Sequence, residues 1–105
     1  MRQISEKKLL VVEGIDEENF FASLLENIDL SGIQIFPEGG KDKIRGGLKA
    51  LRATANFDKV ESLAIIRDAN GNPQGAFQSV RDALAAADLP SPRKVNVPFG
   101  ANPLV

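Results

Sequence analysis

Acidic and amide side chains follow two apolar segments of the sequence, at the points where buried strands are expected to end. Glu13 comes after the apolar run 9–12, and Asp68 and Asn70 come after the run 63–66. Because Asp68 and Asn70 stand two residues apart in a turn sequence, both side-chain oxygens can reach one ion. Mg²⁺ is commonly held by one or two carboxylates together with water or phosphate oxygens. The spacing therefore predicts a Mg²⁺ site that Glu13 joins directly or through water, the alternative being that Asp68 and Asn70 only shape the turn and cap the next helix.

A glycine-containing segment followed by basic residues forms a second candidate site. Gly39 and Gly40 precede a helical pattern, where backbone N–H groups can approach a phosphate. The spacing matches neither a Walker motif nor a dinucleotide fingerprint, so a tight turn is the alternative. Basic side chains then recur at helical spacing, which suits either a nucleic-acid backbone or a solvated face; they are Lys41, Arg45, Lys49 and Arg52. The predicted phosphate or nucleic-acid contacts are Gly39, Gly40, Lys41 and Arg45.

The residue types that are missing exclude several kinds of chemistry. The 105 residues include no Cys and no His, so zinc sites of thiolate and imidazole are ruled out, as are nucleophile pairs with His. A metal must be held by oxygen, and proton transfer falls to Asp, Glu or Lys. The net charge of −1 argues against a general nucleic-acid binder but leaves room for a local basic patch. With no apolar run near the ~18 residues that span a membrane and no signal peptide, we expect a cytoplasmic protein without a membrane partner.

Short apolar runs alternate with helical patterns along the chain. Three strands are predicted, at 8–12, 33–36 and 60–66. The order of strands and helices favours a parallel sheet with right-handed crossovers and helices on both faces. We predict the strand order 2-1-3, because Glu13 and Asp68 meet only if the first and third strands are neighbours. Glu38 follows the second strand, so all three acids should lie at the carboxyl edge, where open parallel sheets place their sites.

Each predicted helix has a start signal and an apolar face. The first begins at the N-cap Asp16, with Ile15 and Phe20 as a hydrophobic staple. The third begins with Asn72 as N-cap and Pro73 at the first helical position. The apolar faces are expected to be Phe21, Leu24, Leu25 and Ile28 in the first helix, Ile44, Leu48, Leu51 and Ala55 in the second, and Phe77, Val80, Leu84 and Ala87 in the third.

Two features of the sequence interrupt these patterns. Gly46 and Gly47 weaken the second helix by ~1 kcal/mol each relative to alanine, so they serve close packing against the sheet or the helix begins late. The segment 88–105 is proline-rich and irregular, with a short edge strand predicted at 94–97. We expect residues 1–105 to form one domain.

Three segments together resemble the Toprim family. Residues 9–17, an apolar strand ending in Glu-Gly before a helix, resemble the first Toprim motif, and residues 63–70 resemble the second, a strand ending in Asp-x-Asp. Residues 37–44 are similar to the glycine-containing segment between them. The resemblance covers about residues 8–90. It is greatest to compact stand-alone Toprim-like proteins, which are related to OLD-family nucleases and bacterial primases.

The resemblance implies a three-layer Toprim or Rossmann-like sandwich and Mg²⁺-dependent phosphoryl transfer on nucleic acid. It places Glu13 as general acid-base or metal ligand, and Asp68 and Asn70 as Mg²⁺ ligands. Asn70 replaces an aspartate of the family, so the site should bind Mg²⁺ more weakly. The chain stops where another strand is expected, as in a truncated domain or an inactive remnant. The alternatives are a non-catalytic module that binds nucleotide or nucleic acid and an interaction domain, and an exposed sheet edge would allow a homodimer.

Overall fold

The computed structural model describes residues 3–38, 43–68, 71–101 and 103–105. Strands and helices alternate along the chain as the sequence pattern predicts. The elements are β1 (Lys8–Val12), α1 (Ile15–Asn27), β2 (Ile33–Pro37), α2 (Ile44–Arg52), the short 3-10 helix η1 (Phe57–Lys59), β3 (Ser62–Ile65) and α3 (Pro73–Ala86).

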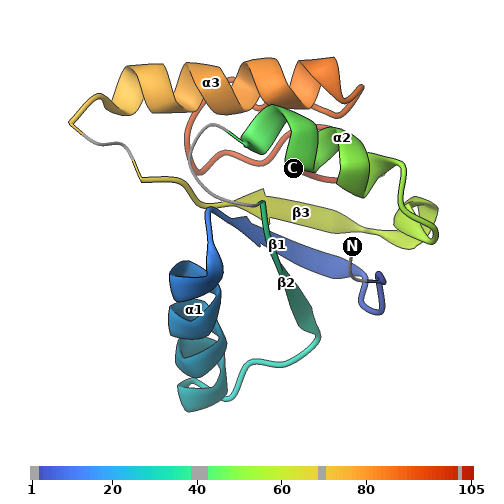
Figure 1. The fold of residues 1–105 in the computed structure, drawn as a ribbon. Coiled ribbons are helices and arrows are strands. Elements are labelled where there is room, and N and C mark those ends of the chain that lie inside the picture. The colour runs from blue at the N-terminus through green and yellow to red at the C-terminus, as the bar shows by residue number, and fades with distance from the viewer. Residues whose placement is uncertain (1–2, 39–42, 69–70, 102) are drawn as a thin grey trace.

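The three strands form a parallel sheet in the order β2-β1-β3, which confirms the predicted topology. Leu10 stands at the centre, in register with Ile35 on one side and Ala64 on the other. The chain leaves β1 toward β2 and then crosses back to β3, so right-handed crossovers place α1 and α2 on opposite faces. Figure 1 shows this arrangement, with α1 on one side of the sheet and α2 and α3 together on the other.

The hydrophobic core lies between the sheet and the pair α2 and α3. Leu9 and Val11 of β1 point into it, and Leu48 and Leu84 meet them from the two helices with almost no exposed surface. The predicted core positions Ile44, Leu48 and Leu51 of α2 are buried, as expected. Ala55 is an exception, because α2 ends at Arg52 and Ala55 is exposed beyond it.

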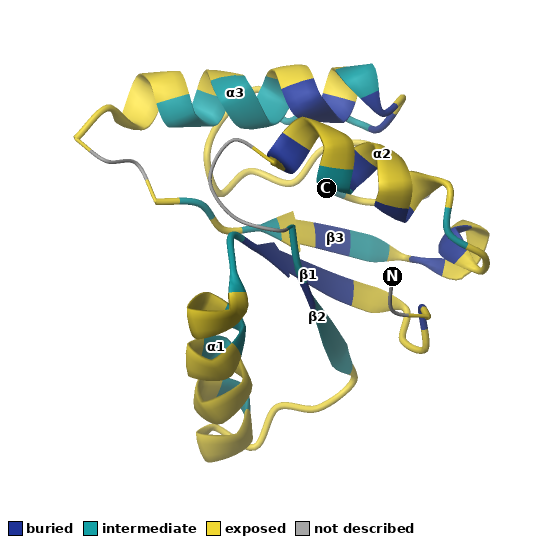
Figure 2. Cartoon of the chain, in the orientation of Figure 1, coloured by how far each residue is buried: buried dark blue, intermediate teal, exposed yellow. Residues whose placement is uncertain are grey.

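Helix α1 differs from its prediction. It begins at Ile15, with Gly14 at the N-cap in extended backbone, so Asp16 lies in the first turn instead of capping the helix. None of its residues is buried; the exposed fraction is 62% for Phe20, 39% for Leu24 and 58% for Ile28. The reason is geometric: in the described part of the chain, α1 is the one helix on its face of the sheet, and it packs mainly against the edge strand β2. Of the residues expected to be buried, Phe21 is therefore only half-buried and Leu24 is exposed. Figure 2 shows that α1 as a whole is largely exposed.

Helix α3 starts as predicted, because the Asn72 side chain accepts a hydrogen bond from the Gly75 N–H at 3.1 Å and Pro73 follows it. Of its predicted face, Leu84 is buried, whereas Phe77 and Val80 are half-buried. The edge strand predicted at 94–97 is wrong, since this segment forms a turn. The chain reaches the sheet later, where Leu104 makes an isolated parallel bridge to Ser62. Within the described residues no helix is long and apolar enough to cross a lipid bilayer.

Candidate functional site

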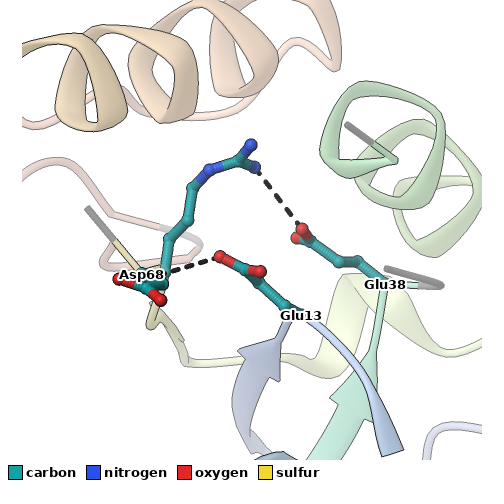
Figure 3. Close-up of polar contacts among 4 residues, drawn as sticks. Glu13, Glu38 and Asp68 are labelled. Carbon is teal, nitrogen blue, oxygen red and sulfur yellow. Dashed lines mark hydrogen bonds and ion pairs between the residues drawn. The ribbon is translucent and has the colours of Figure 1, made fainter. Parts of the chain in front are cut away.

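The carboxyl ends of the three strands bring three acidic residues to one edge of the sheet (Figure 3). Glu13 follows β1, Glu38 follows β2, and Asp68 follows β3 after Ile66 and Arg67. Parallel pairing fixes this arrangement, since neighbouring strands that run the same way end at the same edge. The predicted grouping of the three residues at that edge is confirmed.

Glu13 ties the end of β1 to the loop after β3. Its Oε1 accepts a hydrogen bond from the Asp68 backbone N–H at 2.8 Å. The connection lies where the chain leaves β1 toward one face and β3 toward the other, which is the switch point at which open parallel sheets bind ligands. Asp68 itself is an exposed residue.

Glu38 and Arg67 form an ion pair at the same edge. Arg67 Nη1 lies 3.5 Å from Glu38 Oε1, and the exposed fraction of the side chains is 12% for Arg67 and 2% for Glu38. Burial raises the pKa of Glu38 from 4.5 to about 7; the Arg67 guanidinium opposes this rise, and the negative charge of Glu13 adds to it. A carboxyl group with that pKa can donate or accept a proton near neutral pH.

Sequence reasoning placed Glu38 at the sheet edge but did not include it among the functional residues. The signal that could have identified it was its position directly after a strand, equivalent to that of Glu13. The glycines that follow drew the interpretation toward a phosphate-binding turn instead. The burial of Glu38 depends on how closely α2 packs against it at Gly47, and no spacing rule predicts that packing.

Gly47 lets α2 approach Glu38 closely. A Cβ built at Gly47 would lie 3.1 Å from the Glu38 Cβ and 3.3 Å from the Glu38 carbonyl oxygen. By contrast, a Cβ at Gly46 would have no neighbour within 4 Å. The proposal that the glycines serve close packing thus holds for Gly47 and not for Gly46, and the contact is with the acidic edge itself.

Several predicted site residues lie outside the described residues: Asn70, Gly39, Gly40 and Lys41. Arg45 is exposed in the first turn of α2, and Lys49 and Arg52 are exposed further along the helix. Arg52 also stacks over the Phe57 ring, with its guanidinium carbon 5.5 Å from the ring centroid.

The fit to a metal ion can be judged from Glu13 and Asp68. Both offer carboxylate oxygens, the donor type that Mg²⁺ takes. No group of three or more acidic residues able to hold a metal occurs within the described part of the chain. An ion held by these two carboxylates would need further ligands, such as water or phosphate oxygens.

The fold and this edge define a small doubly wound α/β domain with an acidic site at its switch point. The chain matches the model of the family described as Protein of unknown function (DUF3226) over residues 7–99, and it belongs to that family. The matched span contains every strand and helix named above. No curated protein and no solved structure matches the chain.

Proposed function

We propose that this domain carries out Mg²⁺-dependent phosphoryl transfer on nucleic acid, as a Toprim-like nuclease or a weakened relative of one. The observation that carries the proposal is the hydrogen bond from the Asp68 N–H to Glu13, which joins the ends of the two segments that resemble Toprim motifs. Two carboxylates at the switch point of a parallel sheet suit a divalent cation better than an anionic ligand alone. The absence of cysteine accords with a cytoplasmic location.

The roles of the residues follow from their placement. Glu13 and Asp68 would hold the ion, together with Asn70. A bound Mg²⁺ would supply positive charge to a phosphoryl group. Glu13 keeps the β3 loop against β1 through its hydrogen bond, and it has a second carboxylate oxygen for a ligand or proton. Arg45, exposed in the first turn of α2, would contact a phosphate of the substrate.

A titration with MgCl₂ followed by amide NMR tests this proposal. Saturable shifts are expected at Glu13, Gly14 and Asp68, with NaCl at matched ionic strength as the blank. Asp68→Asn should weaken the response strongly, because it removes a charged ligand. Glu61→Gln is the matched control, since Glu61 is an exposed acid paired with Lys7 away from this edge. Shifts that are absent, or equal in Asp68→Asn and the parent, would contradict the metal site.

Activity is tested separately with a labelled single-stranded oligonucleotide. Cleavage should require Mg²⁺ and should be lost in Glu13→Gln, which keeps an oxygen to accept the Asp68 hydrogen bond but lacks the charge. Metal binding without cleavage would identify a remnant that has kept the site and lost the reaction. Cleavage that continues in Glu13→Gln would remove this residue from the mechanism.

A non-catalytic nucleic-acid module is the second candidate, and the exposed basic face of α2 favours it. Lys49 is exposed, whereas its neighbour Leu48 is buried. If the face binds a nucleic-acid backbone, Lys49→Glu with Arg52→Glu should weaken binding and flatten its dependence on salt. Unchanged affinity at low salt would show that this face is only solvated.

A further inference from the structure

An apolar groove of about 650 Å³ follows the outer edge of β3 and extends over Lys8, Leu9 and Leu10 of β1 to Ile33 of β2. All four residues of β3 line it, and α3 and the segment 92–98 form its flanks. Because the lining includes Leu63 and Ile65 from one face of the sheet and Ala64 from the other, the groove wraps around the strand edge.

Apolar side chains of α3 turn toward this groove. Phe77 and Val80 have the spacing of a core face, yet both are only half-buried and both line the groove. Leu84, one turn further along the same face, is buried. The apolar face of α3 thus continues from the buried Leu84 to the half-buried Phe77 and Val80, which line the groove together with the residues of β3.

The backbone of β3 offers hydrogen bonds along the same edge. Ser62 and Ile66 donate their N–H groups to Lys7 and Val11, toward β1. Along a strand, the backbone groups of successive residues point to alternate sides. Leu63 accordingly points its N–H outward and donates it to the Leu104 carbonyl at 2.8 Å. The same alternation turns the Leu63 carbonyl and the Ile65 N–H outward, at the next positions of a parallel ladder.

Leu104 shows which strand direction this edge accepts. Its N–H donates to the Glu61 carbonyl at 3.0 Å, and its carbonyl accepts from Leu63, which together make a parallel bridge with Ser62. Within the described residues, this bridge covers only the beginning of the outer edge. An added strand in the same direction would bridge Ala64 next, donating to the Leu63 carbonyl and accepting from the Ile65 N–H.

The charge of the groove is one-sided. The charged residues among those that line it are Lys8, Arg67 and Lys94, and no acidic residue lines it in the described part of the chain. Arg67 is already paired with Glu38, whereas Lys8 and Lys94 are exposed. Lys8 is in register with Ser62, so it lies near the amino end of any strand parallel to β3.

We propose that the β3 edge binds an extended apolar segment of a partner protein, which adds to the sheet as a fourth strand parallel to β3 and carries an acidic residue near its amino end. Backbone hydrogen bonds give such a strand its register, and its alternate side chains meet Phe77 and Val80. A second copy of this chain fits the edge less well. Antiparallel pairing of two β3 strands centred on Ile65 would need both the N–H and the carbonyl of Leu63. Leu104 already occupies one of them.

The probe is an acetylated and amidated peptide of one glutamate followed by alternating valine and threonine. On binding to the ¹⁵N-labelled chain, the Ile65 amide should shift, and its hydrogen exchange should slow by about tenfold or more. The same peptide with lysine in place of glutamate should bind at least about fivefold more weakly. Equal affinity of the two peptides, or an unchanged Ile65 amide, would overturn the proposal.

Two peptide variants test the backbone pairing. N-methylation of every second residue removes the donors on one side of an extended strand and leaves the other side intact. One of the two alternately methylated peptides should lose binding and the other should keep it. Equal effects of the two methylation patterns would exclude strand addition. A spin label on the peptide's amino end should broaden signals near Ser62, and broadening near Arg67 would contradict the parallel direction.

Matched variants of α3 test the groove. Ala76→Glu puts a bulky negative charge on a lining residue and should abolish binding, whereas Ala85→Glu makes the same change at an exposed position of α3 outside the groove. Both variants are checked for folding by circular dichroism, and Val80→Thr replaces Ala76→Glu if that variant unfolds. Equal binding by the variant and its control would refute the assignment, as would protection of the Ile65 amide in a dimer without peptide.

Discussion

Replacing Glu38 with glutamine should remove most of the pH dependence of stability between pH 4.5 and about 7. The pKa of Glu38 is about 7 in the folded chain and 4.5 as its ordinary value. Between these values the folded state keeps a proton that the unfolded state has released. The free energy of unfolding therefore falls as the pH rises: the contribution of Glu38 is fully present below pH 4.5 and is lost as the pH passes through about 7.

The magnitude follows from the size of the shift. At about 1.4 kcal/mol per pKa unit, moving from 4.5 to about 7 corresponds to roughly 3 kcal/mol of stability lost between acid and neutral pH. The low exposure of the Glu38 side chain, 2%, is what makes a contribution of this size reasonable. The chain contains no histidine, so no imidazole titrates in the same interval.

Urea denaturation followed by far-ultraviolet circular dichroism measures this effect, since the chain has no Trp or Tyr. The parent should lose stability between pH 4.5 and about 7 and level off above that, and Glu38→Gln should give a nearly flat profile. Glu61→Gln is the control, because it removes one carboxylate from an exposed surface pair and should keep the parental slope. A Glu38→Gln profile as steep as the parent's would refute the assignment of the slope to Glu38.

The remaining predictions concern packing and the metal site. Gly46→Ala should stabilise the chain by about 1 kcal/mol in urea denaturation through helix propensity, while Gly47→Ala should gain less or lose stability because its Cβ meets Glu38; equal gains would contradict that contact. Leu48→Ala should lower the free energy of unfolding by about 2–5 kcal/mol, and Leu24→Ala, at an exposed position, by less than about 1 kcal/mol. A large loss for Leu24→Ala would show that this face of α1 is covered. Asn70→Asp should raise the melting temperature more in Mg²⁺ than the parent does, and equal responses would separate Asn70 from the ion.

The sheet and its acidic edge could be predicted because both depend on local signals. Apolar runs of strand length and turn residues after them locate the ends of β1 and β3, and parallel pairing then forces Glu13 and Asp68 together. The strand order followed from one requirement, that these two residues be neighbours. The strand order brings Asp68 close to Glu13, but it does not predict the hydrogen bond between the Asp68 N–H and the Glu13 side chain.

Helix α1 shows where the sequence pattern fails. Periodicity reveals which side of a helix is apolar, but not how much surface the rest of the fold supplies to cover it. One helix stands on the α1 face against an edge strand, so Phe20 and Leu24 stay exposed although the pattern marks Leu24 as core. The same limitation explains why Phe77 and Val80 are only half-buried. Their spacing is that of a core face, but that side of α3 faces the groove beside β3.

Glu38 was missed for a different reason, because its properties arise from residues on three elements. Gly47 of α2 makes room for it, Arg67 after β3 supplies the opposing charge, and Glu13 after β1 raises its pKa. Glu13 therefore acts electrostatically on the buried Glu38 carboxyl and would also contact the proposed ion. Burial is the main cause of the raised pKa of Glu38, and the charge of Glu13 adds to it. A cation held by Glu13 would offset that added part, so the stability change between acid and neutral pH would become somewhat smaller. A cation at Glu13 would therefore be coupled to the protonation of Glu38, and charge alone sets the sign of that coupling.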